Sequence, residues 1–107
     1  MEELKKDIER VCFALGTNAE RVCSRDRHQR ISDQRTALIY ALGLTGKYTY
    51  KDIGKAVGRC HSCVREATMR VQTWMKYQRN YSQQCVYVIK ANMALDDNYK
   101  IKIVKNF

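Results

Sequence analysis

The sequence predicts an all-α fold, a helical bundle that contains a helix-turn-helix. The chain has 107 residues with no proline and five glycines, so few residues interrupt a helix. Apolar residues recur every three or four positions along most of its length, which is the period of a helix. A chain of this size can bury one hydrophobic core. We therefore expect one helical domain over residues 1–95 and a loosely ordered tail over residues 96–107.

Two helices are expected at the start of the chain. The first has apolar residues at helical spacing and ends at Gly16. These apolar residues are Leu4, Ile8, Val11 and Leu15. Thr17 and Glu20 match a capping box, in which each side chain accepts a hydrogen bond from the other residue's backbone N–H. A short second helix should therefore run through Val22 and Cys23.

A basic loop and a third helix come next. The loop has the sequence SRDRHQR, residues 24–30, and contains no apolar residue. Ser32 is suited to cap the third helix, which should end near Gly43 to Gly46. The apolar stripe of this helix is Ala37, Leu38, Ala41 and Leu42.

The segment from Thr49 onward predicts the helix-turn-helix. Thr49 and Asp52 form a second capping box, which opens a short helix, and Gly58 is suited to the left-handed residue that closes it. The inward residues of this helix are Ile53, Ala56 and Val57. Those of the longer helix that follows are Val64, Ala67, Val71 and Trp74. In such a motif the second helix enters the major groove of DNA. In this register four residues face outward, where base edges would lie: Cys60, His61, Ser62 and Arg65.

A last helix is expected from Ser82. Its predicted apolar stripe is Cys85, Val86, Ile89 and Met93. The ending NYKIKIVKNF alternates charged and apolar residues as a strand does, but it has no obvious partner strand. It is therefore assigned to the tail.

The positive charge is concentrated in one segment. Residues 21–79 contain thirteen Lys and Arg against four Asp and Glu, a net charge of +9 that equals that of the whole chain. Nine of these thirteen bases are arginine, whose planar guanidinium suits phosphate and guanine. A localised basic segment of this kind favours a nucleic-acid partner.

The cysteines leave three interpretations open. Their odd number and irregular spacing suit free thiols in a reducing compartment better than disulfides. Cys60 and Cys63 form a CxxC, which can belong to a thiol redox site, to half of a zinc site or to a DNA-reading helix with incidental cysteines. A redox enzyme needs an adjoining strand and a zinc site needs four ligands, so we expect no metal, no cofactor and no catalysis, while oxidative regulation stays open. The remaining cysteines are expected to fill the core: Cys12, Cys23 and Cys85.

Membrane and secretion signals are not evident. The longest apolar run, ALIYALGL, is too short to cross a bilayer, and the charged start does not match a secretion signal. No Walker-type phosphate-binding motif occurs. We expect a cytoplasmic protein with no membrane partner, associated with the nucleoid.

Several segments occur in the order and spacing of a known family. They are the leading helices, the basic loop SRDRHQRIS, the segment QRTALIYAL, and DIGKAVGR followed by CHSCVREA. Together they resemble the carboxy-terminal DNA-binding domain of the DnaA chromosomal replication initiator, whose signature is IGxxFGRDH[ST]TVxxA. Cys60, Cys63 and Arg65 stand where the family has an acidic residue, a threonine and an apolar residue.

The resemblance implies sequence-specific binding of double-stranded DNA in replication or transcription control. His61 and Ser62 match the family's base readers, and an arginine of the basic loop would enter the minor groove. Contacts to phosphate or the minor groove are expected from Arg25, Arg27, Arg30, Arg35, Lys47, Lys51, Lys55 and Arg59. The alternative is a helical module that binds replication or transcription proteins.

Overall fold

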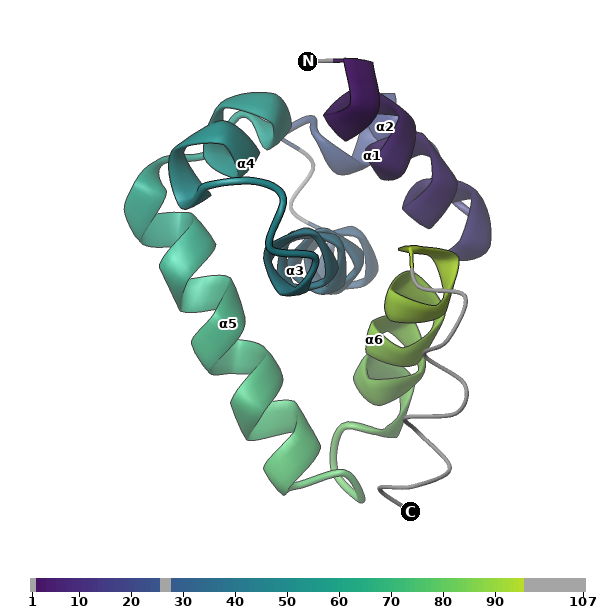
Figure 1. The fold of residues 1–107 in the computed structure, drawn as a ribbon. Coiled ribbons are helices and arrows are strands. Elements are labelled where there is room, and N and C mark those ends of the chain that lie inside the picture. Colours follow the sequence, from purple (N-terminus) through teal and green to yellow (C-terminus); the bar gives the residue numbers. More distant parts are fainter. Residues whose placement is uncertain (1, 26–27, 96–107) are drawn as a thin grey trace.

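The chain folds into α-helices packed around a central one, as a computed structural model describes for residues 2–25 and 28–95. The helices are α1 (Glu2–Ala14), α2 (Ala19–Val22), α3 (Gln29–Leu44), α4 (Tyr50–Val57), α5 (His61–Lys76) and α6 (Ser82–Leu95). Figure 1 shows α3 at the centre, and it contacts each of the other five helices. No strand occurs in the described residues, and the predicted all-α helical bundle is confirmed.

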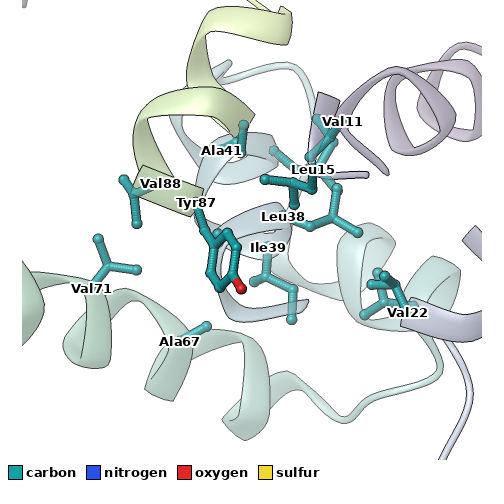
Figure 2. Close-up of a cluster of buried hydrophobic side chains, with 14 of the residues drawn as sticks. Val11, Leu15, Val22, Leu38, Ile39, Ala41, Ala67, Val71, Tyr87 and Val88 are labelled. Atoms are coloured by element: carbon teal, nitrogen blue, oxygen red, sulfur yellow. The ribbon is translucent and has the colours of Figure 1, made fainter. Parts of the chain in front are cut away.

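One hydrophobic core joins the helices, and most of the predicted apolar stripes contribute to it. The predicted apolar residues of α1, α3 and α5 are all buried. Figure 2 shows side chains from α1, α2, α3, α5 and α6 meeting in this cluster, with Tyr87 of α6 among them. Trp74 is buried as expected, and Tyr40 packs half-buried against the core.

The start of α2 differs from the prediction. Gly16 does adopt the left-handed conformation, with φ of 75°, after α1. The cap of α2, however, is Asn18, whose side chain accepts a hydrogen bond from the backbone N–H of Arg21 at 2.8 Å. The Thr17 N–H instead donates to the Cys12 carbonyl and closes the end of α1. The predicted capping box of Thr17 and Glu20 is therefore wrong by one residue.

The start of α3 lies earlier than the sequence predicts. Gln29 begins the helix, so Arg30 is helical and Ser32 lies inside the first turns rather than at the cap. Ile31 is the one apolar buried residue here, and the four buried residues that follow it are polar, so an apolar pattern does not mark this part of the helix: Asp33, Gln34, Arg35 and Thr36. Asp33 is buried and accepts hydrogen bonds from the amides of Gln29 at 2.8 Å and Gln84 at 3.1 Å.

α6 begins at Ser82 as predicted but presents a different face to the core. Val86 and Met93 are exposed, and Ile89 is half-buried. The buried residues are Cys85, Tyr87, Val88, Ala91 and Asn92. Asn92 can replace an apolar residue because its amide donates to the Val88 carbonyl at 2.8 Å. The predicted stripe is correct only at Cys85.

Two further expectations concern the C-terminal tail and membrane-spanning helices. The predicted tail, residues 96–107, lies outside the described residues. Among the helices described, none has both the length and the apolar character that crossing a membrane requires.

Candidate nucleic-acid interface

The helix-turn-helix consists of α4, a short turn and α5. The predicted capping box opens α4, because Thr49 Oγ1 accepts from the Asp52 N–H at 3.1 Å and Asp52 Oδ2 accepts from the Thr49 N–H at 3.4 Å. Gly58 ends the helix in the left-handed conformation, with φ of 70°. Ile53 and Val57 are buried as predicted, but Ala56 is exposed. The third inward position is taken by Gly54 instead.

Gly54 permits the close approach of α4 to the turn. A Cβ atom built on this residue would lie 2.6 Å from the Arg59 carbonyl oxygen and 3.3 Å from Val64 Cγ2. The backbone N–H of Arg59 also donates to the Gly54 carbonyl at 2.8 Å. The glycine therefore determines how closely the first turn of α5 packs on α4.

The predicted base readers lie on the open side of α5. Cys60 is the N-cap residue, and it is exposed together with His61, Ser62 and Arg65. The His61 ring lies 5.7 Å from the ring of Tyr50, which opens α4. Val64 and Ala67 are buried in the core, so the predicted register of the helix is confirmed. What these side chains bind stays a prediction.

Met69 belongs to the same open face and was not predicted. It lies one helical turn beyond Arg65, and 62% of it is exposed. In the sequence, Met69 does not fall on the apolar stripe formed by Val64, Ala67 and Val71. A large apolar residue outside that stripe is the signal that could have identified it. An apolar side chain on a groove-facing helix can contact the methyl group of thymine.

Two arginines anchor the basic loop to the helix-turn-helix. The Ser24 carbonyl accepts hydrogen bonds from Arg59 Nη2 at 2.7 Å and from Arg35 Nη2 at 3.1 Å. Arg35 Nε also donates to the Val22 carbonyl at 2.6 Å. The chain leaving α2 is thereby tied both to α3 and to the turn that precedes α5.

This arrangement gives Arg35 and Arg59 hydrogen bonds within the protein, while the DNA contacts expected from them stay predictions. Arg35 is only 8% exposed and lies inside the protein. Arg59 is half-buried, and its guanidinium also donates to the Gly58 carbonyl at 3.0 Å. Both arginines donate to backbone carbonyls near the basic loop.

The other predicted loop residues are found on the surface. Arg25 and Arg30 are exposed, the latter in the first turn of α3. His28 precedes that helix and makes no side-chain capping hydrogen bond. Arg27 lies outside the described residues.

The lysines divide into two groups. Lys51 and Lys55 are exposed on α4, one turn apart. Lys47 is instead paired with two carboxylates of α1, at 2.9 Å from Glu3 Oε1 and 3.1 Å from Asp7 Oδ2. These hydrogen bonds raise the pKa of Lys47 above its ordinary value. Lys47 therefore already has two carboxylate partners within the protein, and the phosphate contact expected from it stays a prediction.

The CxxC cysteines lie together at the start of α5, and both are free thiols. The sulfur atoms of Cys60 and Cys63 are 3.3 Å apart, so either thiol can donate to the other. The pKa of Cys60 lies below its ordinary value because Cys63 donates to its sulfur, and the backbone N–H of Cys63 adds to this, although no regular capping hydrogen bond forms. The pKa of Cys63 is raised by the same contact.

The other cysteines are more enclosed. Cys12 and Cys85 are buried and Cys23 is half-buried, as expected for core filling. Burial raises the pKa of all three thiols, to about 12 for Cys12. Across residues 2–25 and 28–95, no group of three or more His, Cys, Asp or Glu residues is placed to hold a metal ion.

Comparison with known proteins does not extend this description. No family model, curated protein or solved structure matches the chain. Its function is therefore argued from the surface of the helix-turn-helix.

Proposed function

We propose that the chain binds double-stranded DNA sequence-specifically through α5. The observation that carries this proposal is the exposed, polar and basic N-terminal face of the second helix in a helix-turn-helix, with His61, Ser62 and Arg65 on it. In proteins with this motif the N-terminal residues of the second helix contact base edges in the major groove. The resemblance to the DnaA domain supports the same assignment and suggests replication or transcription control.

Exposed basic residues on the elements next to α5 would contact phosphates. Lys51 and Lys55 lie on α4, and Arg25 and Arg30 lie on the loop and at the start of α3. Arg30 lies in the first turn of α3, and the N-terminus of a helix favours anions. Phosphate contacts of this type set the position of a protein on the duplex but do not distinguish sequences.

Base reading is assigned to the exposed side of α5. Arg65 is the proposed guanine reader, because a guanidinium can donate to the O6 and N7 atoms of guanine together. Met69, one turn further, is suited to a thymine methyl group. His61 can donate to or accept from a base edge according to its protonation. The proposed target is therefore a short site with at least one guanine.

The test compares Arg65→Ala with Lys51→Ala after a preferred sequence has been selected from random duplexes. Both residues are exposed and both substitutions remove one positive charge, so the lysine variant is a matched control. Arg65→Ala should lose about 1–3 kcal/mol of discrimination at one base position. Lys51→Ala should weaken selected and random duplexes about equally and reduce the salt slope by roughly one.

Two results would contradict the proposal. Equal, uniform losses from the two substitutions would remove base reading from α5. A folded protein with no affinity for duplex DNA at low salt would remove DNA binding altogether.

A protein-interaction module is the second candidate, and one apolar feature favours it. Phe13 on α1 is 87% exposed, beside a shallow apolar hollow that also includes Ala14 and Ala94. Figure 1 shows α1 and α5 on different sides of α3, so this hollow is separate from the proposed DNA surface. Phe13→Ser should leave duplex affinity unchanged, and its effect on binding to replication or transcription proteins would measure the alternative.

A further inference from the structure

Cys60 and Cys63 form a contact pair inside the proposed recognition surface. Their sulfur atoms are 3.3 Å apart, across the first turn of α5. Cys60 is exposed at the N-cap, and Cys63 is half-buried one turn later. The residues between them, His61 and Ser62, are two of the proposed base readers. An oxidant in solution can thus reach one sulfur while the second is already in position.

Cys60 differs from every other cysteine of the chain, because it is exposed and its pKa is lowered. Cys12 and Cys85 are buried, and Cys23 is half-buried. Thiolates, rather than thiols, react with oxidants, so enclosed thiols with raised pKa values are slow to react. At Cys60 the environment instead favours the thiolate, because Cys63 and the backbone amides at the helix start stabilise its charge.

We propose that Cys60 and Cys63 are an oxidation site, at which hydroperoxides convert the dithiol into a disulfide across the first turn of α5. The Cys60 thiolate attacks one peroxide oxygen, the O–O bond breaks, and a sulfenic acid forms with release of hydroxide or alkoxide. The sulfur of the Cys63 thiol then attacks that sulfur, the S–O bond breaks as the S–S bond forms, and the departing hydroxide takes up the Cys63 proton and leaves as water. The two cysteines together lose two electrons to the peroxide, and a dithiol reductant reverses the change.

The disulfide would alter the proposed DNA surface. An S–S bond is about 2.05 Å long, so the two sulfur atoms must approach by more than about 1 Å from their present contact. The movement pulls on the turn that contains His61 and Ser62. We expect binding of the selected duplex to weaken about tenfold, the effect of losing one base contact, while random duplex is less affected. This part of the proposal rests on the proposed function.

The chemical test uses the full chain and hydrogen peroxide in slight molar excess. After peroxide treatment, free thiols are alkylated in denaturant and the protein is cleaved with trypsin. Cleavage after Arg59 and Arg65 leaves the peptide CHSCVR, which contains both cysteines of the pair and no other. The expected product is this peptide two hydrogens lighter and not alkylated, while the peptides with Cys12, Cys23 and Cys85 are alkylated. A peptide that stays a dithiol while another cysteine is oxidised would overturn the proposal.

The binding test separates the oxidation site from the proposed function. Wild type and a Cys60→Ser, Cys63→Ser double variant are measured on selected and random duplex, with and without peroxide. If peroxide lowers the duplex affinity of the wild type but not that of the double variant, and dithiothreitol restores it, regulation of DNA binding by oxidation is supported. Unchanged binding by a wild type whose CHSCVR peptide is fully oxidised overturns it. If the reduced protein binds no duplex, the proposed function fails, and the peptide result still decides the oxidation site.

Discussion

Gly54→Ala tests whether the tight packing of the turn against α4 maintains the recognition surface. The added Cβ would lie 2.6 Å from the Arg59 carbonyl oxygen, whereas real Cβ atoms essentially never approach another heavy atom closer than 3.0 Å. The Arg59 oxygen belongs to the backbone, and the same residue's N–H is bonded to Gly54, so neither side can yield independently. On the other side, Val64 Cγ2 at 3.3 Å leaves no room for the methyl group.

The magnitude follows from two opposing effects. Alanine is better than glycine inside a helix by about 1 kcal/mol, which favours the variant. Overpacking in a well-packed site typically costs about 1–3 kcal/mol, and a backbone clash belongs at the upper end of that range. We therefore expect a net destabilisation of about 1–2 kcal/mol. For a domain of this size each kcal/mol lowers the melting temperature by about 4–8 °C.

Gly43→Ala is the matched control for this substitution. Gly43 is also helical, but the nearest atom to its added Cβ is Tyr50 Cε1 at 4.0 Å, and its φ is not positive. It should stabilise the protein by about 0.5–1 kcal/mol, because only the helix preference changes. Thermal unfolding followed by circular dichroism measures both variants. A Gly54→Ala protein that melts at or above the wild-type temperature would refute the close-approach argument.

Further predictions concern the duplex, a buried arginine and a half-buried tyrosine. Duplex affinity should fall with salt with a slope of roughly −3.6 for four phosphate contacts, measured by fluorescence anisotropy; a slope near zero would contradict DNA binding. Arg35→Leu should cost about 1–3 kcal/mol in urea unfolding, because the Val22 carbonyl loses its donor and the Ser24 carbonyl keeps only the hydrogen bond from Arg59; a loss below about 1 kcal/mol would refute the anchoring role. Burial and the Asp7 carboxylate raise the pKa of Tyr48 to about 12 from 10.0. Its protonated form is favoured in the folded state, so Tyr48 should make its full contribution to the free energy of unfolding below pH 10 and lose it as the pH rises toward 12. The difference in the free energy of unfolding between wild type and Tyr48→Phe, measured across this pH range, checks the prediction.

The helix-turn-helix could be predicted because its signals are local. A capping box at Thr49, a glycine at 58 and an apolar stripe from Val64 each act within one or two helical turns, and none depends on a distant residue. The start of α3 depends instead on Asp33, whose buried carboxylate is satisfied by Gln84 of α6. A pattern of apolar spacing cannot register that contact, so it placed the start of α3 too late.

The face of α6 was missed for a related reason. The sequence around Val86 and Met93 is apolar on more than one side, so the helical period alone does not select which side is buried. Packing against α1 and α3 selects the side of Val88 and Asn92, and the polar Asn92 becomes acceptable once it bonds to its own helix. The choice is made by neighbouring helices and not by the sequence of α6.

Within the candidate site, tertiary contacts also decide which arginines are exposed. Arg25, Arg35 and Arg59 are equivalent in a charge count, yet Arg25 is exposed while the other two donate to one carbonyl, that of Ser24. Ser24 immediately precedes Arg25, and Arg59 immediately precedes the N-cap of α5. The hydrogen bond between them therefore fixes the distance from the exposed loop arginine to the first turn of the recognition helix. If the loop contacts the minor groove and α5 the major groove, this hydrogen bond from Arg59 would hold the two contacts at a set distance from each other.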